Sequence, residues 1–306
     1  MKVAVIGAGV MGPGIAQTFL MGGHDAVLID ISEEALEKGV TEVDKCLKLL
    51  EEMELINGAS EMFARMSKAT SMQAAADADL VVEAVPENMD IKESVYQELD
   101  TICKPDAVIV SNTSTMPVFD MFPDIRPGNL FVSHFFNPPA IHPLVEIVCG
   151  DDTNKEKVQW LRETLEACGK KPVVITGFIM GFLMNRLQTA LSREALYLLD
   201  QGVVSEDDLD IATQIGLGFK TAWQGIFSTM DYIGLDTVML AQEILGDDLY
   251  SGSEVSPTIT EKVEAGKLGL KTGEGFYTYG DDAEATQDRR FRMLADQLKL
   301  YKKYGI

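Results

Sequence analysis

The chain has 306 residues, 46% of them hydrophobic, which exceeds the usual size of one domain and is enough to bury a substantial core. Its formal net charge of −22 disfavours a nucleic-acid partner, and no apolar run approaches the roughly 20 residues that span a bilayer. The four cysteines are scattered without CxxC spacing and there are only three histidines, so neither a disulfide framework nor a metal site is indicated. We therefore expect a cytoplasmic, globular protein of two domains with no membrane segment.

The chain opens with an apolar run at residues 2–6, a G-x-G-x-x-G sequence and then a helical pattern. In this context the glycines are a dinucleotide fingerprint: Gly7 permits a tight turn, Gly9 lets the backbone approach a pyrophosphate, and Gly12 allows close packing of helix on strand. The N–H groups at the start of the helix would face the phosphates. The segment predicted to bind the cofactor comprises Gly7, Gly9, Val10, Met11 and Gly12.

A second apolar run at residues 26–29 ends at Asp30, eighteen residues after Gly12. A carboxylate at that place can accept hydrogen bonds from ribose hydroxyls and repels a 2′-phosphate, so the sequence predicts NAD rather than NADP. The alternative is a strand–helix–strand unit that binds no nucleotide.

Strands and helices then alternate. Residues 32–71 have a charged, amphipathic pattern that predicts a helical arm, and apolar runs at 80–85 and 107–110 flank a helix at 92–103. This alternation predicts an α/β fold with a Rossmann-type, doubly wound parallel sheet. Because ligands lie at the carboxyl ends of parallel strands, we expect Glu87 and Ser114 near the cofactor.

The stretch from Val132 to Glu146 holds a histidine and a carboxylate, His134 and Glu146, twelve residues apart in apolar sequence. Two strands joined by a proline-rich turn could bring them together. A buried carboxylate that accepts the Nδ1 proton would leave Nε2 free to take a proton from a substrate hydroxyl. The simpler interpretation is a hydrogen-bonded histidine of the core.

After Glu146 a helix at 155–168 and a strand at 172–175 complete the sheet, and all later periodic segments are helical. We expect a first domain over residues 1–184, which binds the nucleotide and carries the arm, and an all-helical second domain over residues 185–306. Exposed apolar faces of this second domain would suit a homodimer.

Several motifs occur in one order along nearly the whole chain, and with them the chain resembles the 3-hydroxyacyl-CoA dehydrogenase family. That family also contains dehydrogenases of free 3-hydroxy acids, such as gulonate and carnitine, and a lens crystallin. The motifs are Gly7–Gly14, Asp30, V-P-E-N at 85–88, S-N-T-S at 111–114, H-F-F-N-P at 134–138, L-V-E at 144–146, G-F-x-x-N-R at 181–186, G-V-V-S-E-D-D-L-D at 202–210, D-Y-I-G-L-D at 231–236 and K-T-G-E-G-F-Y at 271–277.

The resemblance implies NAD-linked oxidation of a secondary alcohol, with His134 as general base and Glu146 as its orienting carboxylate. Ser114 and Asn185 match positions that hydrogen-bond the reacting oxygen, where negative charge develops. The remaining positions that match cofactor contacts are Asn137 beside the nicotinamide, and Glu87, Lys92 and Lys271 on the ribose and nicotinamide side.

Each assignment has a structural alternative. Ser114 could cap a helix, Asn137 could serve only the turn before Pro138, and Asn185 could bridge the domain junction. Lys92 could lie on a charged helix face. His142 is interpreted as a loop residue without a catalytic role.

We expect the substrate to be a short-chain 3-hydroxyacyl-CoA that is interconverted with the 3-ketoacyl-CoA, and a small free 3-hydroxy acid is the alternative. A short-chain 3-hydroxyacyl-CoA, of the 3-hydroxybutyryl kind, needs basic partners for its phosphates, and the arm's five cations stand among many more acidic residues. A small free 3-hydroxy acid would need no such groove. The two substrate classes can be distinguished by whether Lys45 and Lys48 line a groove that leads to His134. A catalytically silent NAD-binding protein is the third possibility.

Overall fold

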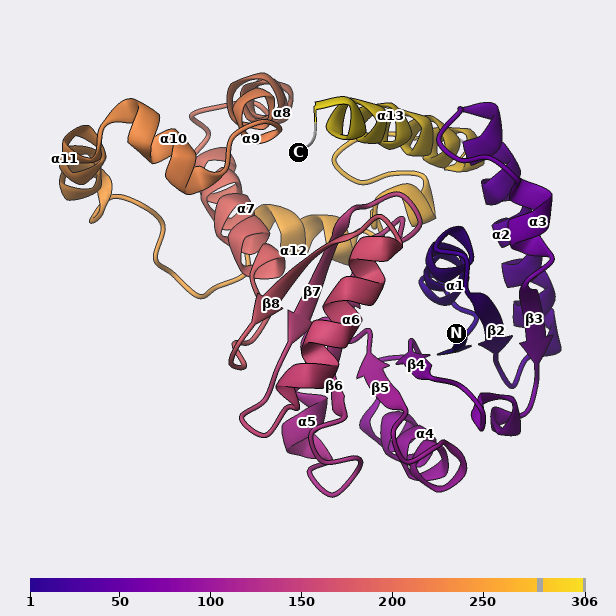
Figure 1. The fold of residues 1–306 in the computed structure, drawn as a ribbon. Helices are drawn as coiled ribbons and strands as arrows, with labels where there is room; N and C mark the ends of the chain where they lie inside the picture. Colours follow the sequence, from indigo (N-terminus) through magenta and orange to yellow (C-terminus); the bar gives the residue numbers. More distant parts are fainter. Residues whose placement is uncertain (280–282, 305–306) are drawn as a thin grey trace. The chain divides into compact units, whose positions relative to one another are not determined.

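The structure is a computed structural model that describes residues 1–279 and 283–304 (Figure 1). It forms two compact units. The first is Met1–Leu183 together with the C-terminal stretch that begins at Phe291, and the second is Met184–Arg290. No helix in the described ranges is long and apolar enough to cross a membrane.

The first unit is built on one sheet, which within the described residues has eight strands in the order β3-β2-β1-β4-β5-β6-β7-β8. All neighbouring strands are parallel except β6 and β7. The predicted Rossmann-type sheet is therefore confirmed, with one antiparallel pair near its edge. The strands are β1 (Lys2–Ile6), β2 (Asp25–Ile29), β3 (Met66–Ala69), β4 (Leu80–Glu83), β5 (Val108–Ser111), β6 (Leu130–Phe135), β7 (Leu144–Val148) and β8 (Lys171–Ile175).

Helices cover both faces of this sheet because side chains alternate between the faces along each strand. Val3 and Val5 of β1 belong to one apolar cluster with α1, α2 and α6, whereas Ala4 and Ile6 belong to a second cluster with η1, α4 and α5. The helices of this unit are α1 (Gly12–Met21), α2 (Glu33–Glu52), α3 (Ala59–Phe63), η1 (Met72–Ala75), α4 (Met89–Ile102), α5 (Val118–Met121) and α6 (Lys155–Ala167).

The arm differs from its prediction. We expected helix over residues 32–71, but only α2 and α3 are helical, and Met66–Ala69 forms the edge strand β3 beside β2. Ser32 caps the start of α2, since its side chain accepts a hydrogen bond from the Ala35 N–H at 3.2 Å. The end of the arm becomes a strand because the backbone groups of β2 would otherwise be unpaired along this edge.

The second unit is helical, as predicted. The helical stretch over residues 226–245 is divided into α10 and α11 at Gly234, whose φ of 99° lies outside the helical region. The helical elements are α7 (Met184–Asp200), α8 (Glu206–Ile211), η2 (Ala212–Gly218, a π-helix), α9 (Phe219–Thr221), α10 (Ile226–Ile233), α11 (Leu235–Leu245), α12 (Pro257–Glu264) and η3 (Leu270–Thr272).

The last helix, α13 (Ala283–Tyr304), departs from the expected division at residue 185, because its part from Phe291 onward groups with the first unit. Ala295 of α13 is fully buried in a small cluster with Leu50 of α2 and Ile141. Phe291, Leu294 and Leu298 pack around the same cluster. Because this apolar face packs against α2, the part of α13 from Phe291 onward belongs to the first unit. A division of the sequence at one residue could not predict this packing.

Candidate active site

The antiparallel pair β6–β7 places His134 directly opposite Glu146. Both side chains are buried, and Nδ1 of His134 lies 2.9 Å from Oε2 of Glu146. The other oxygen of Glu146, Oε1, accepts a hydrogen bond from the Leu183 N–H at 3.0 Å. A carboxylate can only accept, so Nδ1 carries the proton and Nε2 is left as the acceptor of the neutral ring.

Aromatic rings restrict the orientation of this imidazole. The ring centroids of Phe136 and Phe182 lie 4.5 Å and 5.6 Å from that of His134. Phe182 is completely buried, and His134 is only 6% exposed. The histidine is thus held by packing as well as by Glu146.

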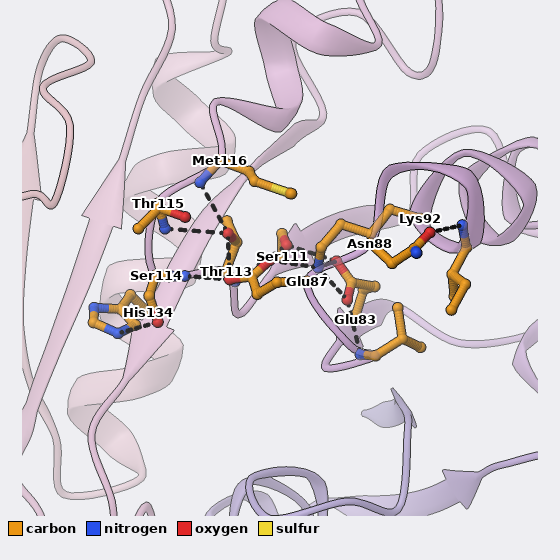
Figure 2. Close-up of polar contacts among 12 residues, drawn as sticks. Glu83, Glu87, Asn88, Lys92, Ser111, Thr113, Ser114, Thr115, Met116 and His134 are labelled. Atoms are coloured by element: carbon orange, nitrogen blue, oxygen red, sulfur yellow. Dashed lines mark hydrogen bonds and ion pairs between the residues drawn. The ribbon is translucent and has the colours of Figure 1, made fainter. Parts of the chain in front are cut away.

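Nε2 of His134 faces Ser114, whose Oγ is 3.4 Å away. Ser114 lies beyond the end of β5, and its N–H donates to Oε1 of Glu87 at 2.8 Å. Thr113 Oγ1 donates to the same oxygen at 2.8 Å and accepts from the Met116 N–H at 3.0 Å (Figure 2). Ser114 is not a helix cap, since α5 begins after Pro117 without a side-chain cap.

Lys92 belongs to a buried network around Glu83 that the sequence did not reveal, and it also contacts the exposed Glu87. Lys92 is 1% exposed, so it does not lie on an open helix face. Its Nζ donates to both oxygens of Glu83, at 2.8 and 2.9 Å, and lies 3.4 Å from Oε2 of Glu87. Figure 2 shows the contacts that continue from Lys92 through Glu87 and Ser114 to His134.

Glu83, at the end of β4, is the centre of this network. Its carboxylate accepts from Ser111 Oγ at 2.6 Å, from the Val85 N–H at 2.8 Å and from the Tyr96 hydroxyl. Burial, followed by the charge of Glu83, raises the pKa of Tyr96 well above its ordinary value, so the phenol stays a donor. The signal available in the sequence was an acidic residue that ends a buried strand ahead of a helix carrying a lysine.

The glycine turn between β1 and α1 has the geometry of a pyrophosphate cradle. A Cβ at Gly7 would lie 2.6 Å from the Ala84 carbonyl oxygen, and one at Gly12 would overlap the Gly7 carbonyl oxygen. At Gly9, in contrast, a Cβ would meet nothing within 4 Å, so the backbone is open to a ligand. Helix α1 begins after Met11 without a side-chain cap or an acidic residue in its first turn, and its N–H groups suit an anion.

Asp30 lies beside this turn, as predicted for a ribose ligand. Its Oδ2 accepts from the Ala8 N–H at 2.7 Å and its Oδ1 from the Ser32 N–H at 2.9 Å. Each oxygen keeps a second lone pair for a ribose hydroxyl. These residues fit NAD, which would sit with its pyrophosphate on the glycine turn and its adenosine ribose at Asp30.

The other candidate residues are less constrained. Asn137 is exposed and precedes a cis peptide bond to Pro138. Asn185 and Lys271 belong to the second unit, where Asn185 lines a groove of about 380 Å³ along α7 together with Gln188, Thr189 and Ser192. Their roles toward substrate and cofactor stay predictions.

Asn112 is a further residue that the sequence did not single out. Its Oδ1 accepts from the Phe135 N–H at 2.8 Å, which ties the end of β5 to the end of β6 beside His134. Among the described residues, no group of His, Cys, Asp and Glu has the arrangement of a metal site.

The fold and the glycine turn define an NAD-binding oxidoreductase. Two family profiles match the chain: the 3-hydroxyacyl-CoA dehydrogenase NAD-binding domain over residues 2–177, and the C-terminal domain of the same family over residues 181–279. The chain therefore belongs to the 3-hydroxyacyl-CoA dehydrogenase family, as its motifs predicted.

Its relatives differ in substrate. A probable 3-hydroxybutyryl-CoA dehydrogenase of Deinococcus radiodurans is 37% identical and covers 91% of this chain and 100% of its own. The 5-formyl-3-hydroxy-2-methylpyridine 4-carboxylate 5-dehydrogenase of Mesorhizobium japonicum is 33% identical over 96% of both chains. A crystal structure of a 5-dehydrogenase of that name, described as an NAD⁺-dependent dismutase, superimposes with a TM-score of 0.91 at 31% identity over 98% of both chains.

Proposed function

We propose that this protein interconverts a secondary alcohol and the corresponding carbonyl compound, with His134 as the acid–base group and NAD as the redox partner. The observation that carries this proposal is the buried His134–Glu146 pair, with Nδ1 held at 2.9 Å and Nε2 turned toward Ser114. Bound NAD would supply the hydride acceptor at the reacting carbon.

Residues of the chain would transfer the proton and stabilise the reacting oxygen. In oxidation, Nε2 of His134 takes the hydroxyl proton, and the carboxylate of Glu146 stabilises the imidazolium that forms. Ser114 Oγ, 3.4 Å from Nε2, can donate to the substrate oxygen as it becomes a carbonyl. In reduction, the imidazolium returns the proton to that oxygen.

We further propose that the substrate is a small free carboxylic acid rather than a coenzyme A thioester. The arm offers few unneutralised cations for phosphates: Lys48 pairs with Asp44 at 2.6 Å, and Lys68 pairs with Glu33 and Glu37. The apolar face of α2 around Leu50 is covered by α13. A long polyanionic ligand would therefore find little electrostatic support along this helix.

One comparison agrees with the free-acid proposal. The relative that matches 96% of both chains is named for a free pyridine carboxylate.

The second candidate is a short-chain 3-hydroxyacyl-CoA, which the 37% identity to the D. radiodurans relative favours. NADH oxidation measured with acetoacetyl-CoA, acetoacetate and other small keto carboxylates separates the two. We expect higher kcat/KM for a free acid; a 100-fold preference for acetoacetyl-CoA would overturn that choice.

The double variant Lys45→Ala, Lys48→Ala should leave KM unchanged for a free acid and raise it for a thioester. No turnover despite tight NADH binding would indicate the catalytically silent protein.

We also propose that the second unit forms a homodimer. No residue of α7–α12 is buried, and large apolar side chains are open, including Phe227 at 82% and Tyr232 at 79% exposure. Exposed apolar area on this scale marks an interaction surface. Light scattering should give twice the mass of one chain, and Phe227→Glu should reduce it, whereas Lys220→Glu should not.

A further inference from the structure

Lys170 is a buried lysine outside the residues so far given a role. It lies between α6 and β8 and is 4% exposed, and no carboxylate of the described residues pairs with it. Its Nζ instead donates to three main-chain carbonyl oxygens: to that of Pro139, to that of Ala140 at 3.2 Å and to that of His142 at 3.1 Å. An ammonium has three N–H donors, so this set uses its full capacity.

All three carbonyl groups belong to one loop, residues 136–143, which joins β6 to β7. This loop connects the strand of His134 to the strand of Glu146. The next residue also binds the loop, since the Lys171 N–H donates to the Pro143 carbonyl oxygen at 2.7 Å. The start of β8 therefore holds the loop at both Lys170 and Lys171.

The opposite side of the loop rests on α1, the helix that follows the glycine turn. Thr18 Oγ1 donates to the Pro139 carbonyl oxygen at 3.2 Å. A Cβ at Gly14 would lie 2.8 Å from Cδ of Pro139, so helix and loop are in direct contact. The loop is thus fixed between the nucleotide-binding helix and the ammonium of Lys170.

We propose that Lys170 is a positioning residue, whose ammonium fixes the loop that joins His134 to Glu146 relative to α1. It acts through main-chain groups and does not touch the reacting atoms. Without it, three inward-facing carbonyl groups would lose their donor, and the loop that carries Asn137 would loosen. A displacement of about 1 Å at a catalytic group can cost about 100-fold in rate. The inference rests on the proposed role of His134.

The clamp, by which we mean the three hydrogen bonds from Nζ of Lys170 to the loop, should depend on pH. Burial lowers the pKa of Lys170 to about 7; the neighbouring Cys168 acts in the opposite direction, and Lys302 of α13 acts with burial. The groups that face the ammonium are these two and His142, whose carbonyl is one of its acceptors. Deprotonation leaves two N–H donors and no charge for three acceptors, so the loop should open more readily above neutral pH.

The first test compares Lys170→Met with Lys171→Met, an exposed neighbour whose loop contact is made by its main chain. Lys170→Met should lower kcat by about 10- to 100-fold, with NADH affinity within about threefold of the wild type, while Lys171→Met changes neither. A folded Lys170→Met variant with wild-type kcat would overturn the inference. If His134→Ala also kept its activity, the proposed function would fail instead.

The second test uses the wild-type protein and needs no variant to fold. Hydrogen–deuterium exchange of the amides of residues 140–142, corrected for the intrinsic pH dependence, reports the loop directly. The amides of Ile141 and His142 both donate to the Pro138 carbonyl oxygen. Their protection should fall several-fold between pH 6 and about pH 8.5. Constant protection over that range would contradict the clamp, whatever the enzyme assays show.

Discussion

His134 and Glu146 face each other across β6 and β7, with 2.9 Å between Nδ1 and Oε2. Residues directly opposite in an antiparallel pair have the shortest cross-strand distances in a sheet. The pair therefore depends on strand register, and a slip of one residue would turn His134 to the other face. This dependence makes the pair, and the loop that joins its two strands, the part of the site most sensitive to substitution.

Replacing His134 by alanine should lower kcat by about 10²- to 10⁴-fold, because proton transfer to a positioned base contributes that much. NADH affinity, measured by fluorescence titration, should stay within about twofold, since the glycine turn lies on other strands. His24→Gln is the matched control, because His24 lies between α1 and β2 and its ring packs on Phe19. A parallel loss of NADH affinity would indicate that His134 is structural.

Glu146→Gln should lower kcat while the protein stays folded. The amide cannot stabilise an imidazolium as a carboxylate does, and its NH₂ would face the N–H of His134 or of Leu183. We expect a loss of about 10- to 1,000-fold in steady-state kcat. Ser133→Ala, on the neighbouring position of β6, should leave kcat unchanged. A Gln variant as active as the wild type would remove Glu146 from the mechanism.

Asp30→Asn should relax the preference for NAD. The change removes the charge that repels a 2′-phosphate and weakens the acceptor for the Ala8 N–H. The ratio of kcat/KM for NAD to that for NADP should fall by at least about tenfold, which is 1.4 kcal/mol. Asp25→Asn, an exposed residue at the start of β2, is the control and should not alter the ratio. An unaltered ratio in Asp30→Asn would mean that another residue selects the cofactor.

Lys92→Met should destabilise the fold strongly. Removing one partner of a buried ion pair leaves the other charge uncompensated, which costs about 3–5 kcal/mol. Glu83 would keep its hydrogen bonds from Ser111 and Tyr96 but lose its counter-charge. Urea denaturation should show this loss, whereas Lys48→Ala, which breaks an exposed pair with Asp44, should cost about 0.5 kcal/mol or less. Similar losses in both variants would contradict the network.

The sequence revealed those parts of the site that depend on local order. The glycine turn, Asp30 at a strand end and the strand–turn–strand of His134 and Glu146 each follow from a short segment. Lys92 could not be assigned in this way, because the direction of its helix face depends on how α4 packs against β4. The strand at Met66–Ala69 and the packing of α13 on α2 could not be predicted for the same reason. Each depends on an element far away in the sequence: β2 pairs with the strand, and α2 packs against α13.

The cysteines should react only slowly in the native protein. Burial raises the pKa of Cys149 and of Cys168 to about 11, so at pH 8 their thiolate fraction is about 100-fold lower than at an ordinary pKa of about 9. Alkylation by iodoacetamide, followed peptide by peptide, should be correspondingly slow at pH 8 and accelerate toward pH 11. The unfolded chain in urea, at the same pH, is the control and should react at the rate of a free thiol.

The raised pKa values of Cys149 and Cys168 also determine how the stability of the fold changes at alkaline pH. Between about pH 9 and pH 11 the folded chain keeps thiol protons that the unfolded chain releases, so the free energy of unfolding should fall as the pH rises through that window. The variant Cys149→Ala, Cys168→Ala should lose less stability between pH 8.5 and pH 10.5 than the wild type, because it lacks both groups. Rapid labelling of either native thiol at pH 8, or equal alkaline losses in the two proteins, would show that these side chains are not buried as the structure has them.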